Sequence, residues 1–154
     1  NHGGGITIAE SELFAIHQKT LGSRPADYGA DFLARALPAC LFNAYEYVQA
    51  QRLRRRLRAD METVLAVTPD VLLMPATPTP APADLMTTGD PVFQAPWTAC
   101  GLPLLNLPVG LDSSGLPMGV QLAGRGWDEE TLLRAGRWVE RTLQVNLGEP
   151  PLAT

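Results

Sequence analysis

Two copies of the tripeptide Gly-Leu-Pro, at 101–103 and 115–117, constrain the fold of this chain most strongly. A short apolar run follows each copy, at 104–109 after the first and at 118–123 after the second. Between the runs, Asp112-Ser113-Ser114-Gly115 has the composition of a tight turn. Short apolar runs bounded by turn residues are typical of strands, so this segment predicts an antiparallel β-hairpin.

A helix is predicted after the hairpin. Asp128 is a preferred N-cap residue, and Glu129 and Glu130 follow it in the first turn, where the helix dipole favours acidic side chains. The predicted buried stripe consists of Leu132, Leu133, Ala135, Trp138 (or Gly136), Val139 and Leu143. Residues 1–145 are expected to form one domain, and the polar, proline-containing residues 146–154 are expected to form a tail.

Two helical segments are predicted near the start of the chain. Thr7 and Glu10 stand at capping-box spacing, which predicts a first helix over about 8 to 21. Pro25 suits the first turn of a second segment, which closes at or near Pro38.

A long third helix is predicted from beyond Pro38 to about residue 66. Four apolar residues repeat in it at four-residue spacing, which predicts one buried face: Leu53, Leu57, Met61 and Leu65. Five arginines lie among them: Arg52, Arg54, Arg55, Arg56 and Arg58. Since the chain carries a net charge of −4 and no aromatic residues alternate with these arginines, a solvated helix face is favoured over a nucleic-acid site.

A further strand is predicted at Asp70–Pro75, where a continuous apolar run ends at a proline. Such runs are typical of strands that are covered on both faces, which predicts part of a central sheet in an α/β protein. The segment 76–90 contains Pro78, Pro80 and Pro82 and is therefore expected to be an irregular loop.

The composition excludes several classes of function. With 45% hydrophobic and 18% charged residues, the chain is expected to fold as a globular domain. No apolar run approaches the roughly 20 residues that span a bilayer, and no secretory signal pattern is present, so a cytoplasmic location is expected. Cys40 and Cys100 lie apart with no metal-ligand spacing, which predicts reduced, packed thiols and no metal site.

No catalytic group is identified from the residues themselves. Ser113 and Ser114 suit the hairpin turn better than a nucleophile role, because neither has an adjacent base. His17 is expected to border the apolar face of the first helix as a structural residue. Lys19, the single lysine, is expected to stabilise the end of that helix through its dipole.

Three patches resemble the amidase signature family. The hairpin, with its two Gly-Leu-Pro copies, its Gly-x-Gln-Leu strand at 119–122 and the acidic-capped helix, is similar to the C-terminal end of these enzymes. The segment 70–78 resembles the family's Asp-x-Leu-x-x-Pro-x-x-Pro strand and loop. Glu46-Tyr47, Ala50 and Arg54 resemble the Asp-Tyr-x-x-Ala-x-x-x-Arg pattern of its long helix.

The resemblance implies part of the amidase signature fold, an α/β fold with a mixed central sheet flanked by helices. It also implies hydrolysis of carbon–nitrogen amide bonds through an acyl-serine intermediate. The family's Ser-Ser-Lys triad lies upstream of the matching region, so the chain is expected to be a C-terminal fragment that is inactive alone, with no catalytic residue and no cofactor. The implied substrate-binding residues, one wall of the acyl pocket, are Pro75, Ala76, Thr77, Phe93, Gln94, Trp97 and Thr98.

Alternatives remain at this point. The A component of a tRNA-dependent amidotransferase typically has Asn where this chain has Thr98, and an acidic residue where it has Pro91, so an amidase acting on another small-molecule amide is preferred. A non-enzymatic scaffold or self-association module is the rival from another class. In either case, the exposed edge of a partial sheet predicts a homo-oligomer.

Overall fold

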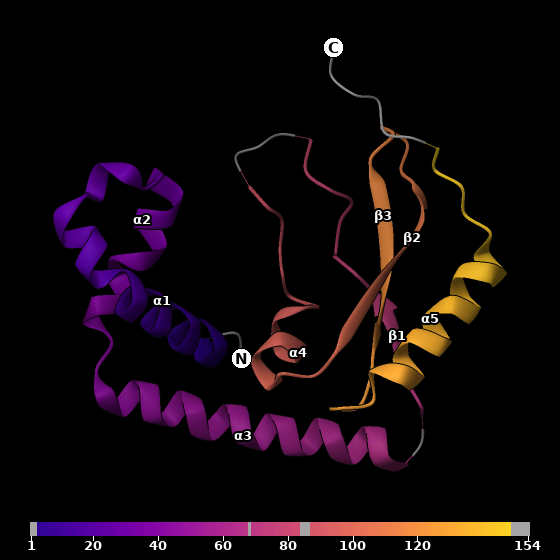
Figure 1. Cartoon of the computed structure of the whole chain (residues 1–154), viewed down its shortest axis with the longest axis horizontal. Coiled ribbons are helices and arrows are strands. Elements are labelled where there is room, and N and C mark those ends of the chain that lie inside the picture. Colours follow the sequence, from indigo (N-terminus) through magenta and orange to yellow (C-terminus); the bar gives the residue numbers. More distant parts are fainter. Residues whose placement is uncertain (1–2, 68, 84–86, 149–154) are drawn as a thin grey trace. The chain divides into compact units, whose positions relative to one another are not determined.

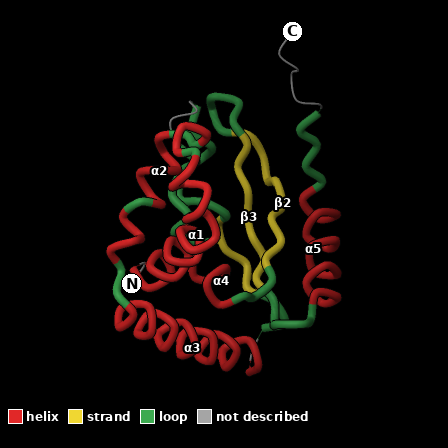
Figure 2. Tube along the Cα trace, turned by 60° about the vertical axis from the view of Figure 1, so that its left-hand side comes forward, coloured by secondary structure: helices red, strands yellow, loops and turns green. Residues whose placement is uncertain are grey.

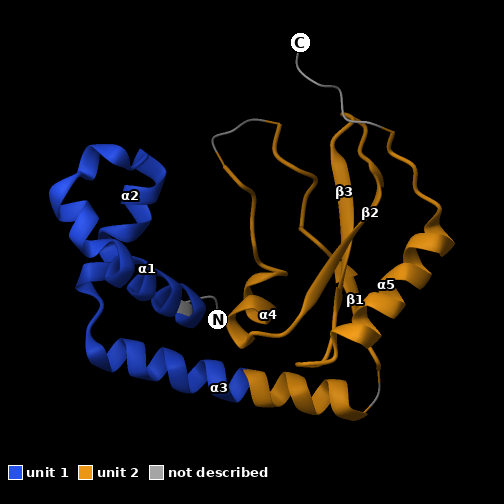
Figure 3. Ribbon diagram, viewed as in Figure 1, with its two compact units in different colours: residues 1–57 blue, residues 58–154 orange. Residues whose placement is uncertain are grey.

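A computed structural model describes residues 3–67, 69–83 and 87–148 (Figure 1). The chain divides into two compact units, Asn1–Leu57 and Arg58–Thr154, which are coloured separately in Figure 3. The boundary lies within helix α3 (Ala44–Val67). The predicted division into a domain of 1–145 and a tail of 146–154 stays a prediction, and the tail beyond residue 148 lies outside the described residues.

The described part of unit 1 consists of helices and their connections. Its elements are α1 (Gly3–Ser23), the short 3-10 helix η1 (Pro25–Asp27), α2 (Ala30–Ala36), the 3-10 helix η2 (Pro38–Leu41) and the first part of α3. Helix α1 packs closely against α3 at Gly4, where an added Cβ atom would lie 3.1 Å from Cδ2 of Leu53. The hydroxyl of Tyr47 donates to Oε1 of Glu12 at 3.0 Å, which joins the same two helices.

The helix starts differ from those predicted. Helix α1 is already formed at Gly3, so Thr7 and Glu10 lie inside it and the predicted capping box is wrong. A capping box is found instead at α3, where the backbone N–H of Asn43 donates to Glu46 and the N–H of Glu46 donates to Asn43, both at 2.9 Å. The end of α3 at Val67 agrees with the predicted end near residue 66.

Unit 2 is built on a three-stranded sheet in the order β1-β3-β2. Its strands are β1 (Leu72–Pro75), β2 (Leu104–Leu111) and β3 (Pro117–Ala123), and both pairs are antiparallel. The predicted hairpin is confirmed as β2 and β3. Pro75 and Pro108 both lie in the outer strands, where a missing N–H costs no ladder bond on the outer side.

The repeated Gly-Leu-Pro has a backbone reason. Gly101 and Gly115 both adopt the left-handed region, with φ of 66° and 78°, which favours glycine. In the hairpin turn, Oδ1 of Asp112 accepts hydrogen bonds from the N–H groups of Ser114 and Leu116 at 2.9 and 2.8 Å. Each glycine therefore ends the element before it, and the Leu-Pro pair leads into the next strand.

The two faces of the sheet are covered by different helices. Helix α5 (Glu129–Leu143) lies against the face of Leu105 and Leu122, since Gly136 lies close to both. Gln121 is adjacent to Leu122 and so faces the opposite side, where it contacts the segment that leads into α4 (Ala95–Cys100). Figures 1 and 2 show α5 and α4 on opposite sides of the β2–β3 pair, which confirms the predicted α/β class.

Helix α5 confirms its predicted cap and corrects its predicted buried stripe. The carboxylate of Asp128 accepts from the N–H of Thr131 at 3.4 Å. Leu132 and Gly136 are buried, whereas Leu133 is 59% and Trp138 is 68% exposed. Of the two alternatives predicted for one position, Gly136 is therefore the buried one, because only a residue without a side chain fits against Leu105 and Leu122.

Two further predictions are corrected. Burial alternates along β1 and Leu73 is 61% exposed, so the described residues do not cover the run 70–75 on both faces. Both cysteines were predicted to be packed, but only Cys100 is buried, whereas Cys40 is exposed in η2.

Two arginines bind the carbonyl groups at the ends of helices in unit 2. Nε of Arg125 donates to the Leu65 carbonyl at 2.9 Å near the end of α3, where the helix supplies no N–H donor. NH1 of Arg58 donates to the Cys100 carbonyl at 3.2 Å at the end of α4. Arg52, Arg55 and Arg56 are exposed as predicted, whereas Arg54 and Arg58 are half-buried and depart from a purely solvated arginine face.

We expect Gly136→Ala to lower the stability of unit 2. An added Cβ would overlap Cδ2 of Leu105, and overpacking costs about 1–3 kcal/mol, which exceeds the gain of about 1 kcal/mol in helix propensity. Urea unfolding followed by tryptophan fluorescence measures this, because all three tryptophans lie in unit 2. The matched control is Gly22→Ala in α1, where an added Cβ would meet no atom within 4 Å outside its own helix backbone. Circular dichroism should show unchanged or raised stability for this variant.

We also expect Arg125→Met to lower the unfolding free energy of unit 2 by about 1.5–3 kcal/mol, because hydrogen bonds from a charged donor are lost. Asp70→Asn removes only the 3.8 Å ion pair to Arg125, and since the Asp70 side chain is 83% exposed, its effect should stay below about 1 kcal/mol. Equal losses in the two variants would show that the carbonyl contacts of Arg125 do not stabilise the unit.

Candidate functional site

The first part of the candidate site is the end of β1. The N–H of Ala76 donates to the Gly119 carbonyl of β3 at 3.0 Å, and the Ala76 side chain is buried. A Cβ on Gly119 would lie 3.4 Å from that of Ala76, so glycine at this position leaves room for it. Pro75 is exposed, and Thr77 is half-buried with its hydroxyl donating to the Thr79 carbonyl at 2.6 Å.

The second part is the segment that leads into α4. The Pro91 carbonyl accepts hydrogen bonds from the N–H groups of Gln94 and Ala95 at 2.9 and 2.8 Å, which begins the helix. Trp97 is 7% exposed and Phe93 is 36% exposed, whereas Thr98 is exposed on the outer side of α4. In this chain the indole of Trp97 is therefore part of the core, and its predicted contact with substrate stays a prediction.

Gln121 joins the segment to the sheet. Its Nε2 donates to the Phe93 carbonyl at 2.8 Å, across 28 positions of the sequence, and its side chain is fully buried. Gly119 and Gln121 are two residues apart in β3 and so serve the same face of the sheet. A Cβ on Gly119 would lie 3.4 Å from that of Ala76, and Gln121 binds the Phe93 carbonyl, so Ala76 and Phe93 lie on this face. The structure thus brings together the two groups of predicted residues, those at 75–77 and those at 93–98.

Sequence reasoning did not assign a role to Gln121. The available signal was a carboxamide in an otherwise apolar strand, since a polar residue at a buried position needs a hydrogen-bond partner.

Asp90 carries the carboxylate that is nearest in the sequence to the second part of the site. Its Oδ1 accepts a hydrogen bond from the N–H of Val92 at 2.9 Å, so Asp90 shapes the turn before α4.

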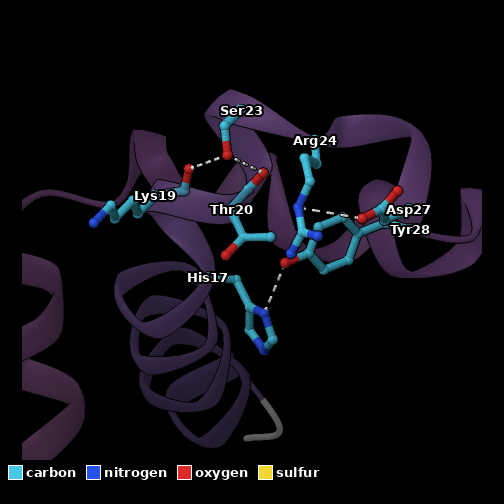
Figure 4. A network of polar contacts seen from close by, with 7 residues as sticks. All are labelled: His17, Lys19, Thr20, Ser23, Arg24, Asp27 and Tyr28. Atoms are coloured by element: carbon cyan, nitrogen blue, oxygen red, sulfur yellow. Dashed lines mark hydrogen bonds and ion pairs between the residues drawn. The ribbon is translucent and has the colours of Figure 1, made fainter.

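The described serine, lysine and histidine side chains do not form a catalytic arrangement in unit 1. The Ser23 hydroxyl donates to the backbone carbonyls of Lys19 and Thr20, and the Lys19 side chain extends away from Ser23 (Figure 4). Nδ1 of His17 is hydrogen-bonded to the Tyr28 hydroxyl at 3.1 Å, and its ring meets that of Phe32 edge-on. These contacts join α1 to the segment 25–36.

Ser113 and Ser114 lie in the exposed turn between β2 and β3. The backbone N–H of Ser114 is bonded to Asp112, as expected for turn residues. The residues of the described chain contain no group of three or more His, Cys, Asp or Glu side chains placed to hold a metal ion. None of its described helices is both long and apolar enough to cross a membrane.

A surface depression of about 270 Å³ lies elsewhere in unit 2. Its lining includes Arg58, Leu102 and Trp127 and none of the predicted substrate-binding residues. The candidate site is therefore described as one wall, formed by the segments 75–77 and 93–98 beside β3.

Comparisons with known proteins identify relatives of most of the chain. The family model described as amidase matches residues 9–133. The A component of glutamyl-tRNA(Gln) amidotransferase from Rhodospirillum rubrum is 40% identical over 150 residues, which cover 89% of this chain and 29% of that protein. The protein of the same name from Mesorhizobium japonicum is 36% identical over 152 residues, covering 89% of this chain and 28% of that protein. The chain thus spans less than a third of the length of these relatives.

Solved structures share its fold. A crystal structure of an amidase superimposes with a TM-score of 0.80 at 26% identity, covering 89% of this chain and 34% of that one. A vestigial protein complex, described as revealing the origins of an s-triazine catabolic enzyme, gives a TM-score of 0.81 at 29% identity, covering 92% and 34%. The predicted fold class is confirmed. Since the family model also matches most of the sequence, the chain belongs to the amidase signature family.

Proposed function

We propose that this chain is the C-terminal portion of an enzyme that cleaves carbon–nitrogen amide bonds through an acyl-serine intermediate. The observation that carries the proposal is the match of residues 9–133 to the amidase family. The catalytic Ser-Ser-Lys residues would come from the part of the relatives that this chain does not span. The chain itself requires no cofactor in this proposal, and its two cysteines, which form no disulfide with each other, suit the reducing cytoplasm.

The role proposed for this chain is one wall of the acyl pocket. The substrate-binding residues are Pro75, Ala76, Thr77, Phe93, Gln94, Trp97 and Thr98. None of these side chains carries a charge, so the wall suits a neutral, largely apolar acyl group. What supports the grouping is that Ala76 and Phe93 are both bonded to β3, at Gly119 and Gln121.

We expect the isolated chain to show no amide hydrolysis and no covalent adduct with a serine-reactive fluorophosphonate, because no described serine has a base beside it. The full-length protein should show both. Intact-mass spectrometry and ammonia release from small primary amides measure the two properties, with the double variant Ser113→Ala/Ser114→Ala as the control for turn labelling. An adduct on Ser113 or Ser114 of the isolated chain would overturn the proposal.

The A component of a glutamyl-tRNA(Gln) amidotransferase is the second candidate, favoured by the names and the 40% and 36% identities of the curated relatives. Thr98 and Pro91 still favour an amidase that acts on another amide. The full-length protein decides between them in an assay with glutamine and glutamyl-tRNA(Gln) beside simple amides. Ammonia transfer from glutamine would establish the second candidate, whereas turnover of simple amides alone would establish the first.

We further propose that the chain self-associates through the outer edge of its sheet. Self-association is also the property on which the rival interpretation, a non-enzymatic scaffold, depends. Within the described residues, β1 and β2 each pair only with β3, and Leu73 on β1 is 61% exposed. An exposed apolar edge strand is a template for pairing with a second copy. Amide hydrolysis by the full-length protein distinguishes the enzyme proposal from the scaffold alternative, since a scaffold would hydrolyse no amide.

Light scattering should therefore give a mass above the 16.6 kDa of one chain. Leu73→Lys should shift the population toward the monomer, because an inward or edge charge opposes strand pairing. Ala59→Lys, which adds the same charge to an exposed position of α3, should leave the distribution unchanged. A monodisperse monomer for the unmodified chain would contradict self-association.

A further inference from the structure

Gln121 is the only polar residue that is buried in the described part of the chain, with 0% of its surface exposed. Its Nε2 has a partner in the Phe93 carbonyl, but its Oε1 is buried and receives no hydrogen bond from the described residues. A buried acceptor without a donor costs free energy. A methionine of similar length would remove this cost, but the Phe93 carbonyl would then lose the donor that Gln121 supplies.

The benefit of the carboxamide lies in the segment that it holds. Two hydrogen bonds from side chains to backbone carbonyls fix the segment at its two ends, one from Gln121 to Phe93 at 2.8 Å and one from Arg58 to Cys100 at 3.2 Å. Gln121 comes from the central strand β3, which is hydrogen-bonded on both sides. The Phe93 carbonyl is therefore held against the centre of the sheet.

We propose that Gln121 is a positioning residue, which fixes the backbone at Phe93 and so sets the placement of Phe93, Gln94, Trp97 and Thr98. This inference rests on the proposed function, in which these side chains form the wall of the acyl pocket. A buried polar group that costs stability and orders a neighbouring segment is characteristic of functional sites. Its contribution is then to the local geometry and not to the stability of unit 2.

The test uses Gln121→Met in this chain. We expect the N–H groups of Gln94, Ala95 and Thr98, which are bonded within the segment, to exchange with solvent deuterium about tenfold faster, as loss of one hydrogen bond implies. The urea midpoint of unit 2 should stay about the same, because relief of the buried Oε1 offsets the loss of the bond to the Phe93 carbonyl. Asn106→Met is the matched control, because Asn106 is opposite Gln121 in the β2–β3 register and exposed.

A spectroscopic readout isolates Trp97. In the background Trp127→Phe/Trp138→Phe, which removes the two exposed indoles, fluorescence reports on Trp97 alone. Gln121→Met should shift its emission toward longer wavelengths, whereas Asn106→Met should not. Unchanged exchange and emission would overturn the proposal, and so would a fall in the urea midpoint or failure to fold, since either would mean that Gln121 serves stability.

The outcome is separable from that of the proposed function. If the segment loosens as expected but the full-length protein hydrolyses no amide, the positioning role stands and the enzyme proposal fails. If the full-length protein is active, Gln121→Met in it should raise KM for amides with large acyl groups by more than it lowers kcat. An equal effect on small and large acyl groups would overturn the assignment of the segment as the pocket wall.

Discussion

The structure of unit 2 depends on β3, the one strand of the described sheet that is hydrogen-bonded along both edges. Its alternate residues serve opposite faces. Leu122 packs toward Gly136 of α5, whereas Gly119 and Gln121 hold the end of β1 and the segment before α4. Every part of the candidate wall is therefore attached to this strand, and a change in its register would exchange the two faces.

Helix ends are fixed in unit 2 by side chains that are distant in the sequence. Arg125, two residues after β3, binds the carbonyl of Leu65 in α3, and Arg58 of α3 binds the carbonyl of Cys100 in α4. These bonds connect the helices to the loops around the sheet. Because a terminal carbonyl has no donor within its own helix, an arginine from elsewhere satisfies it and at the same time sets where the helix ends.

Local patterns predicted several elements well. The hairpin followed from two apolar runs and an Asp-Ser-Ser-Gly turn, and the cap of α5 followed from Asp128. The capping box was assigned to Thr7 and Glu10 but occurs at Asn43 and Glu46, because the same residue spacing also occurs inside helices. The buried stripe of α5 was predicted to contain Trp138 or Gly136, and close packing against Leu105 admits only the glycine.

The sequence by itself determined the hairpin, the long helix and the family resemblance, since these depend on turn chemistry, periodicity and motifs that are local in the chain. Tertiary structure alone decided that β1 pairs with β3, that Ala76 and Phe93 lie on one face, and that Gln121 joins them. The physical reason is that a hydrogen bond across 28 residues depends on how the sheet places its partners, which no local pattern encodes.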